Sequence, residues 1–265
     1  MNMQKSYPLF DHVLNAPSAF TPEDLVQSVR ISKGLQDVNV PALCVLDFDG
    51  DLTDWLVQQD MATPFFPWAC FHTTMYMVEV DGVRCGILAR TIGGPYAVLI
   101  AEQLRVSVVQ LVLGLTSAGR IASTLPLPSF VVATSAVRNE GTSLHYLPAA
   151  ESIACPTPPI VSHLHVELSQ LGTTVLGPVW TTDAPYRETE EQIHRHARAG
   201  VLAVEMQAAA LFAFATAKNV AVGVVAHLTN AIGHSGEQFE KGTEEDSLAI
   251  LRALLRAGQK FLNEM

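Results

Sequence analysis

The sequence has little charge, and most of that charge is negative. Only 16% of its 265 residues are Asp, Glu, Lys or Arg, and the formal net charge is -10. Beside 49% hydrophobic residues, so low a charged fraction argues against disorder and predicts a large apolar core. Because the chain also lacks a Lys- or Arg-rich run, nucleic acid is not an expected partner.

Long apolar runs are missing too. No stretch reaches the ~18 apolar residues that a membrane-spanning helix needs. The N-terminus lacks the apolar region of a secretory signal. We therefore expect a cytoplasmic protein with no membrane partner.

Cysteine is scarce, and no two cysteines form a CxxC pair. The four, each in or near an apolar run, are Cys44, Cys70, Cys85 and Cys155. This pattern indicates reduced thiols in the core and predicts no metal site.

Apolar strands alternate with helices along most of the chain. We expect strands at 42–46, 72–80, 83–89, 108–113, 130–134, 173–180, 201–204 and 220–226. Helices are expected at 22–33, from 95 to about 105, and at 161–171, 188–198, 206–218 and 247–261. Since no linker interrupts this alternation, it predicts one α/β domain over residues 1–265, with a mainly parallel or mixed sheet covered by helices.

The segment 201–215 organises the rest of the chain. Glu205 is the only charged residue between Val201 and Ala217. Burying a lone carboxylate costs several kcal/mol unless it is paired or hydrogen-bonded. Two interpretations stay open: Glu205 faces a ligand at the carboxyl end of a strand, or it holds loop amides together.

Other polar loops follow predicted strands. Asp47-Phe48-Asp49-Gly50-Asp51 resembles the nucleophile loop of haloacid-dehalogenase phosphatases, and part of a calcium loop. A glycine pair, Gly93-Gly94, precedes a helix, as at sites where backbone amides meet a ligand. Thr116 and Ser117 lie in a loop of small residues, Gly114–Gly119, after another strand. His194 and His196 lie on a charged helix and are expected to be solvated.

Four segments, in order, resemble the nucleoside phosphorylase family, which includes uridine phosphorylase, hexameric purine nucleoside phosphorylase and the methylthioadenosine nucleosidases. They are 81–95, 138–146, 182–186 and 204–209, and the resemblance covers roughly residues 40–260. It implies a three-layer α/β sandwich with a central mixed, partly barrel-like sheet flanked by helices. It also implies cleavage of the N-glycosidic bond of a nucleoside. No cofactor is implied, although inorganic phosphate is a possible co-substrate, and the family forms homo-oligomers (dimers, trimers or hexamers).

The resemblance assigns roles to matching residues. Glu205 and Asn230 match catalytic positions, Met206 lies under the sugar, and Gln207 stands where the family binds ribose hydroxyls with a second Glu. The remaining expected substrate-binding residues are Gly93, Gly94, Thr116, Ser117, Asp183, Tyr186, Arg187 and His227.

Several departures from the family pattern fall at the positions where the family binds phosphate. Where the family carries a phosphate-binding arginine after its first strand, this chain has Asp47, Asp49 and Asp51. The family's second arginine falls on Leu113 or Gly114. Its third, which comes from a neighbouring subunit, falls among residues 70–72. Two unit charges ~4 Å apart interact by about 4 kcal/mol at an effective dielectric near 20, so carboxylates there should weaken phosphate binding. Arg90, Arg120 or Arg187 would have to supply the missing charge.

Two further departures concern the sugar and the base. Gln207 has no charge and accepts hydrogen bonds only with its carbonyl. Asn230 cannot donate a proton as an acid, although pyrimidine-cleaving members also lack an acid there.

Several functions therefore stay open. The first is phosphorylase-type cleavage of a nucleoside. The second is hydrolysis by a nucleosidase, with water activated by Asp47, Asp49, Asp51 or Glu205. The third is a nucleoside- or base-binding protein without catalysis, and the fourth is a phosphatase built on Asp47 and Asp49.

Overall fold

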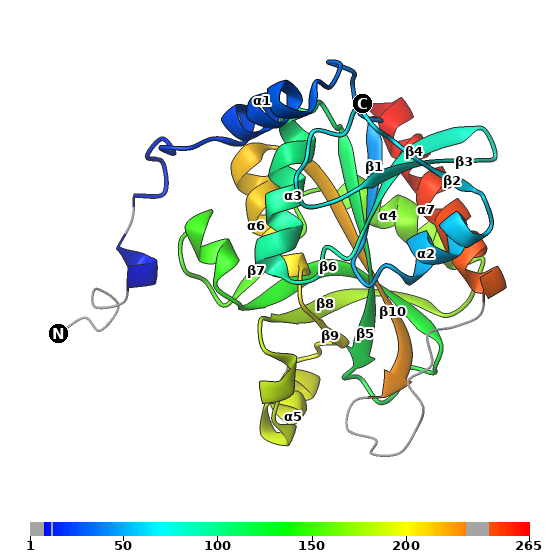
Figure 1. The fold of residues 1–265 in the computed structure, drawn as a ribbon. Helices are drawn as coiled ribbons and strands as arrows, with labels where there is room; N and C mark the ends of the chain where they lie inside the picture. The colour runs from blue at the N-terminus through cyan, green and yellow to red at the C-terminus, as the bar shows by residue number, and fades with distance from the viewer. Residues whose placement is uncertain (1–7, 12, 232–243) are drawn as a thin grey trace.

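The computed structural model describes residues 8–11, 13–231 and 244–265, with 230, 231 and 244–246 described by their backbone alone (Figure 1). The strands are β1 (Leu43–Asp47), β2 (Ala62–Pro64), β3 (Met75–Val80), β4 (Val83–Ala89), β5 (Leu111–Arg120), β6 (Ser129–Asn139), β7 (Ser152–Ala154), β8 (Thr174–Thr182), β9 (Ala203–Glu205) and β10 (Ala221–Ala231). The α-helices are α1 (Pro22–Lys33), α2 (Asp51–Gln58), α3 (Gly94–Val106), α4 (Pro158–Leu168), α5 (Glu190–Arg198), α6 (Ala208–Lys218) and α7 (Glu244–Glu264). Short 3-10 helices are η2 (Pro8–Phe10), η3 (Thr142–His145) and η4 (Pro185–Arg187).

One mixed sheet runs through the molecule in the order β10-β6-β8-β9-β5-β1-β4-β3-β2. β10 also pairs with β5, so β10, β6, β8, β9 and β5 close into a ring. β1 is parallel to both β4 and β5, and β5 is parallel to β10. Helices α3 and α6 lie together on one side of the sheet, and α4 and α7 on the other (Figure 1). This confirms the expected three-layer α/β architecture with a partly barrel-like sheet.

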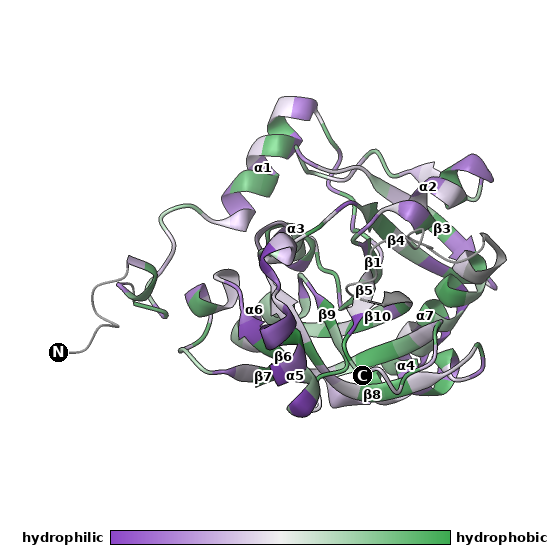
Figure 2. Ribbon diagram, turned by 90° about the horizontal axis from the view of Figure 1, so that it is seen from below, coloured by the Kyte–Doolittle hydropathy of each residue, from purple (hydrophilic) through white to green (hydrophobic). Residues whose placement is uncertain are grey.

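Local signals place the helix ends. Thr21 accepts a hydrogen bond from the backbone N–H of Asp24 and so caps α1, which ends at Gly34 in the left-handed conformation. Helix α6 is apolar on nearly all sides and is buried from Ala208 to Ala215, whereas hydrophilic residues gather on α5 (Figure 2). Among the described residues, no helix is both long and apolar enough to cross a bilayer.

Three predicted strands end too early, and the first is β6, which was expected to end at residue 134 and continues to Asn139. Residues 114–119 are not a loop, because β5 continues to Arg120, and residues 227–231 belong to β10. The parallel ladder between these strands extends from Ala221↔Leu111 to Ala231↔Arg120 with one bulge. Ladder pairing overrides the weak strand propensity of Gly and Ser in this segment. The sequence is acidic between Glu237 and Asp246, and residues 237–243 of this segment lie outside the described residues.

The prediction for His196 is also wrong, whereas His194 is exposed as expected. The His196 ring packs on Trp180 of β8 with ring centroids 4.4 Å apart, because α5 folds back onto that strand. Burial lowers the pKa of His196.

A buried aromatic ring fills the space beside a glycine of β5. Phe48 follows β1 and is fully buried. A Cβ added to Gly114 of β5 would lie 2.7 Å from Cζ of the Phe48 ring. Any side chain at Gly114, including the arginine that the family resemblance would place near there, therefore competes with this ring for the same space.

This contact predicts that Gly114→Ala destabilises the protein, by about 1–3 kcal/mol, the range typical of overpacked cores. The measurement is the free energy of unfolding from chemical denaturation. Gly172→Ala is the matched control, since a Cβ there meets nothing within 4 Å. Equal stability of the two variants would contradict the packing argument.

Candidate functional site

The carboxyl ends of the parallel strands β1, β5 and β10 meet at one edge of the sheet. They enclose a cavity of about 50 Å³. The predicted site residues in its wall are Asp47, Asp49, Asp51, Thr116, Ser117 and His227. Ligand pockets usually span ~300–1,000 Å³, so this cavity has room for a water molecule or two and not for a nucleoside.

The carboxylates of the acidic loop bind backbone amides of the protein itself. Oδ2 of Asp49 accepts a hydrogen bond from the backbone N–H of Ser117 at 2.6 Å. Asp47 is 3% exposed and accepts from the backbone N–H groups of Gly50 and Thr53 at 3.2 and 2.8 Å. Burial raises the pKa of Asp47 to about 6. Asp47 thus caps the start of α2 and is not open to a phosphate ester, which removes the basis for the phosphatase reading.

The arginines proposed to replace the missing phosphate ligands have other contacts. Arg90 lies over Gly50, but its guanidinium pairs with Asp54. Arg120 donates to the carbonyl of Leu125 at 2.7 Å.

Glu205 lies at the end of β9 and is 4% exposed. Oε2 accepts from the backbone N–H groups of Gln207 and Ala208 at 2.6 and 2.8 Å, and Oε1 accepts from the hydroxyl of Thr181. The same hydroxyl accepts from the N–H of Ala209 at 2.9 Å, so the carboxylate and Thr181 together satisfy the first turn of α6. Burial raises the pKa of Glu205 to about 7, with a smaller contribution from Glu140.

The neighbours of Glu205 on the β9–α6 turn also make local contacts. Gln207 is 2% exposed, and its Oε1 accepts from the backbone N–H of Met206 at 3.2 Å. Asn230 is paired with Gly119 near the end of β10, and its side chain lies outside the described part of the chain. The catalytic roles of Glu205 and Asn230 and the sugar contacts of Met206 and Gln207 stay predictions.

A second, larger cavity of about 620 Å³ opens between α1, α3 and η3. Of the predicted site residues, Asp183 lines it, and the backbone N–H of Gly141 donates to Asp183 at 2.9 Å. This hydrogen bond joins segments 138–146 and 182–186, two of the four that carry the resemblance. Thr142 connects the cavity to the glycine pair, since a Cβ on Gly94 would lie 3.4 Å from its hydroxyl oxygen.

Several residues of this region were not predicted from the sequence. The polar ones in the wall of the larger cavity include Glu102, Gln103, His145 and Tyr146. Tyr146 donates to Glu102 at 3.1 Å. Glu140 is 8% exposed, and its Oε1 has no hydrogen-bond partner among the described residues. The segment 138–146 was recognised as part of the family pattern, but nothing in its spacing distinguished Glu140 or Tyr146 as site residues.

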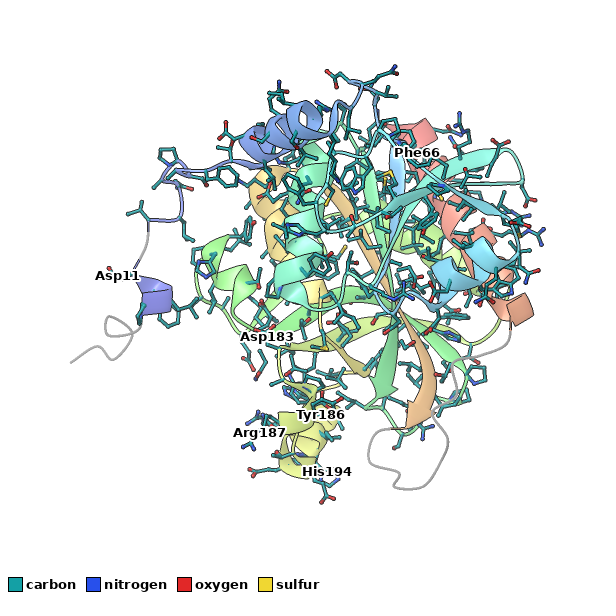
Figure 3. The ribbon with its side chains drawn as sticks, in the orientation of Figure 1. Asp11, Phe66, Asp183, Tyr186, Arg187 and His194 are labelled. Atoms are coloured by element: carbon teal, nitrogen blue, oxygen red, sulfur yellow. The ribbon has the colours of Figure 1, made fainter. Side chains whose placement is uncertain are left out.

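Tyr186 and Arg187 do not join these residues. Both lie on η4 beside α5, and Tyr186 is fully exposed (Figure 3). Neither lines the two cavities described above. Within the described residues, no cluster of three or more His, Cys, Asp or Glu side chains is arranged to hold a metal ion.

Comparisons with known proteins agree with this architecture. A family model described as "Phosphorylase superfamily" matches residues 42–260. The chain is 30% identical over 170 residues to a guanosine phosphorylase from Halorubrum lacusprofundi, covering 63% of this chain and 68% of the relative. It is 27% identical over 152 residues to an uncharacterized protein of Acanthamoeba polyphaga mimivirus, covering 57% of this chain and 59% of that relative.

The raised pKa of Glu205 predicts a pH-dependent stability. The pKa is about 7 in the folded protein against an ordinary value of 4.5, so the folded state holds a proton that the unfolded state has already lost. The free energy of unfolding should therefore fall as the pH rises from 4.5 to about 7, by roughly 3 kcal/mol from this group. Glu205→Gln cannot titrate and should show a correspondingly smaller fall.

The measurement is denaturant unfolding at several pH values across that window. Asp47, whose pKa is also raised, contributes the same sign in both proteins and cancels from the comparison. The exposed helix residue Glu191, changed to Gln, is the control and should reproduce the parent's pH dependence. Parallel curves for the parent and Glu205→Gln would contradict the burial argument.

Proposed function

Because its family model covers residues 42–260, the chain belongs to the phosphorylase superfamily, and we propose that it cleaves the N-glycosidic bond of a nucleoside. The observation that carries this proposal is the cavity of about 620 Å³, whose wall contains parts of two family segments: Gly141, Thr142, His145 and Tyr146 from one, and Asp183 from the other. Its volume lies within the ~300–1,000 Å³ typical of small-molecule pockets. The base would lie on the side of Asp183.

The buried carboxylates suit the charge of such a reaction. Cleavage of a glycosidic bond develops positive charge on the sugar, and negative groups that are already in place stabilise that charge. Glu205 and Glu140 are close enough for Glu140 to raise the pKa of Glu205. A Cβ on Gly94 would lie 3.7 Å from Oε2 of Glu140 and 3.4 Å from the hydroxyl oxygen of Thr142, which lines the larger cavity. In the proposed reaction the sugar binds at this junction.

Homology suggests which nucleoside to test first. One relative is named guanosine phosphorylase, so guanosine is the leading candidate substrate. The family relationship also supports a cytoplasmic homo-oligomer that needs no cofactor beyond inorganic phosphate as a possible co-substrate. Exposed aromatic residues such as Phe66, which is 81% exposed, favour an interface between copies (Figure 3).

A non-catalytic nucleoside-binding protein is the second candidate. Gln207 supports it, because its carbonyl binds the backbone of Met206 and its side chain is buried. A ribose hydroxyl could use only the second lone pair of that carbonyl, and the buried amide brings no negative charge to a sugar cation.

The direct test is incubation of guanosine and other purine and pyrimidine nucleosides with the protein, followed by chromatography of the products. Release of free base supports glycosidic cleavage. Binding in a calorimeter without product supports the binding protein. Neither binding nor product across the panel would overturn both candidates.

The amide at position 230 generates a further prediction. Asn230→Asp supplies a proton donor to the leaving base, and general acid catalysis typically contributes ~10²–10⁴-fold. Purine nucleoside turnover should rise by about tenfold or more, and most at acid pH, where the new carboxyl group is protonated.

The measurement is the pH profile of kcat for purine and pyrimidine nucleosides. Asn263→Asp, which adds the same charge on α7, is the control. An unchanged purine-to-pyrimidine ratio in Asn230→Asp would argue against a position beside the leaving base.

A further inference from the structure

The contact between Asp49 and Ser117 joins the loop after β1 to β5, two segments that the family resemblance connects with phosphate. Asp49 belongs to the loop after β1, and Ser117 lies near the end of β5, its parallel neighbour. Oδ2 of Asp49 accepts the backbone N–H of Ser117 at 2.6 Å. We propose that Asp49 is the residue that selects water instead of inorganic phosphate as the acceptor. This inference rests on the proposed glycosidic cleavage.

A carboxylate and a phosphate compete for the same kind of donor. Both are oxyanions that bind strongly to backbone N–H groups. The N–H of Ser117 already donates to Asp49, so phosphate would have to displace that carboxylate and would then meet its negative charge. Asp47 and Asp51 line the same cavity and add to the repulsion.

An arginine would normally offset the repulsion between the aspartates and a phosphate, but packing leaves no space for one on β5. The ring of Phe48 occupies the space beside Gly114, where a side chain would otherwise enter from β5. Arg90, the cation beside Gly50, pairs with Asp54. Water needs neither a cation nor a large space, and a cavity of about 50 Å³ admits it.

The resulting reaction balances with water alone. The bond between C1′ of the sugar and the base nitrogen breaks, and its electron pair leaves with the base. The oxygen of water bonds to C1′ and keeps one proton as the new hydroxyl. The other proton ends on the base, so the products are free sugar and free base.

The test uses the full chain and titrates inorganic phosphate into it by calorimetry. The parent should show no binding at millimolar phosphate. Asp49→Ala vacates the Ser117 amide and should gain phosphate affinity by at least tenfold. Asp49→Asn keeps an acceptor on that amide but removes the charge, so its gain should be smaller; it also serves if Asp49→Ala fails to fold. Asp11→Ala, far from the cavity, makes the same substitution and should behave as the parent (Figure 3).

Product analysis provides the second readout. With guanosine and phosphate, the parent should form free ribose, and Asp49→Ala should form ribose 1-phosphate in addition. Ribose 1-phosphate from the parent would overturn the role of Asp49 but leave glycosidic cleavage standing. No product from any variant would sink the proposed cleavage, while the phosphate titration would still report on Asp49. Folded Asp49→Ala and Asp49→Asn that bind phosphate no better than the parent would overturn the inference.

Discussion

Carboxylates that accept backbone N–H groups where helices begin are the interaction on which three strand-to-helix turns of this fold depend. Asp47 ends β1 and holds the first turn of α2, and Glu205 ends β9 and holds the first turn of α6. Glu140 follows β6 and accepts the N–H of Ser143 in η3 at 2.9 Å. The first N–H groups of a helix have no partner within it and carry partial positive charge. An acidic residue at the end of the preceding strand supplies the acceptor and so permits a tight strand-to-helix turn.

The same arrangement explains why the sequence predicted the fold better than the site. In open α/β sheets, ligands bind at the carboxyl ends of the strands, so polar residues there indicate a site. A lone buried carboxylate, however, avoids its desolvation cost equally well by binding a ligand or by binding nearby amides. From the sequence, Glu205 fitted both interpretations. In the structure, it accepts hydrogen bonds from Thr181 and from the amides of α6. The spacing of residues in the sequence gives no position for a bound sugar, so it could not assign Glu205 a role in catalysis.

Periodicity and helix-end residues predicted most of the elements because their signals are local. Thr21 and Gly34 bounded α1, and Asn219 ended α6 in the left-handed conformation. The errors arose where a distant segment decided the outcome. The small residues after Leu113 stay in a strand because β10 pairs with them, and His196 is buried because α5 folds onto Trp180. The larger cavity was missed for the same reason, since α1, α3 and η3 are separated in the chain.

These buried carboxylates also connect the loss of a phosphate-binding arginine with the charge that develops in the proposed reaction. The pKa values of Asp47, about 6, and Glu205, about 7, are raised because burial of the charged carboxylate raises the pKa by more than the hydrogen bonds lower it. A phosphate anion beside these carboxylates would raise the free-energy cost of keeping them ionised, whereas water adds no charge. A positively charged sugar in the proposed reaction has the opposite effect, because it is attracted by each of these carboxylates that is ionised. Aspartates where the family carries its first phosphate-binding arginine therefore disfavour an anionic acceptor and, in the proposed reaction, favour a positively charged transition state through the same electrostatic field.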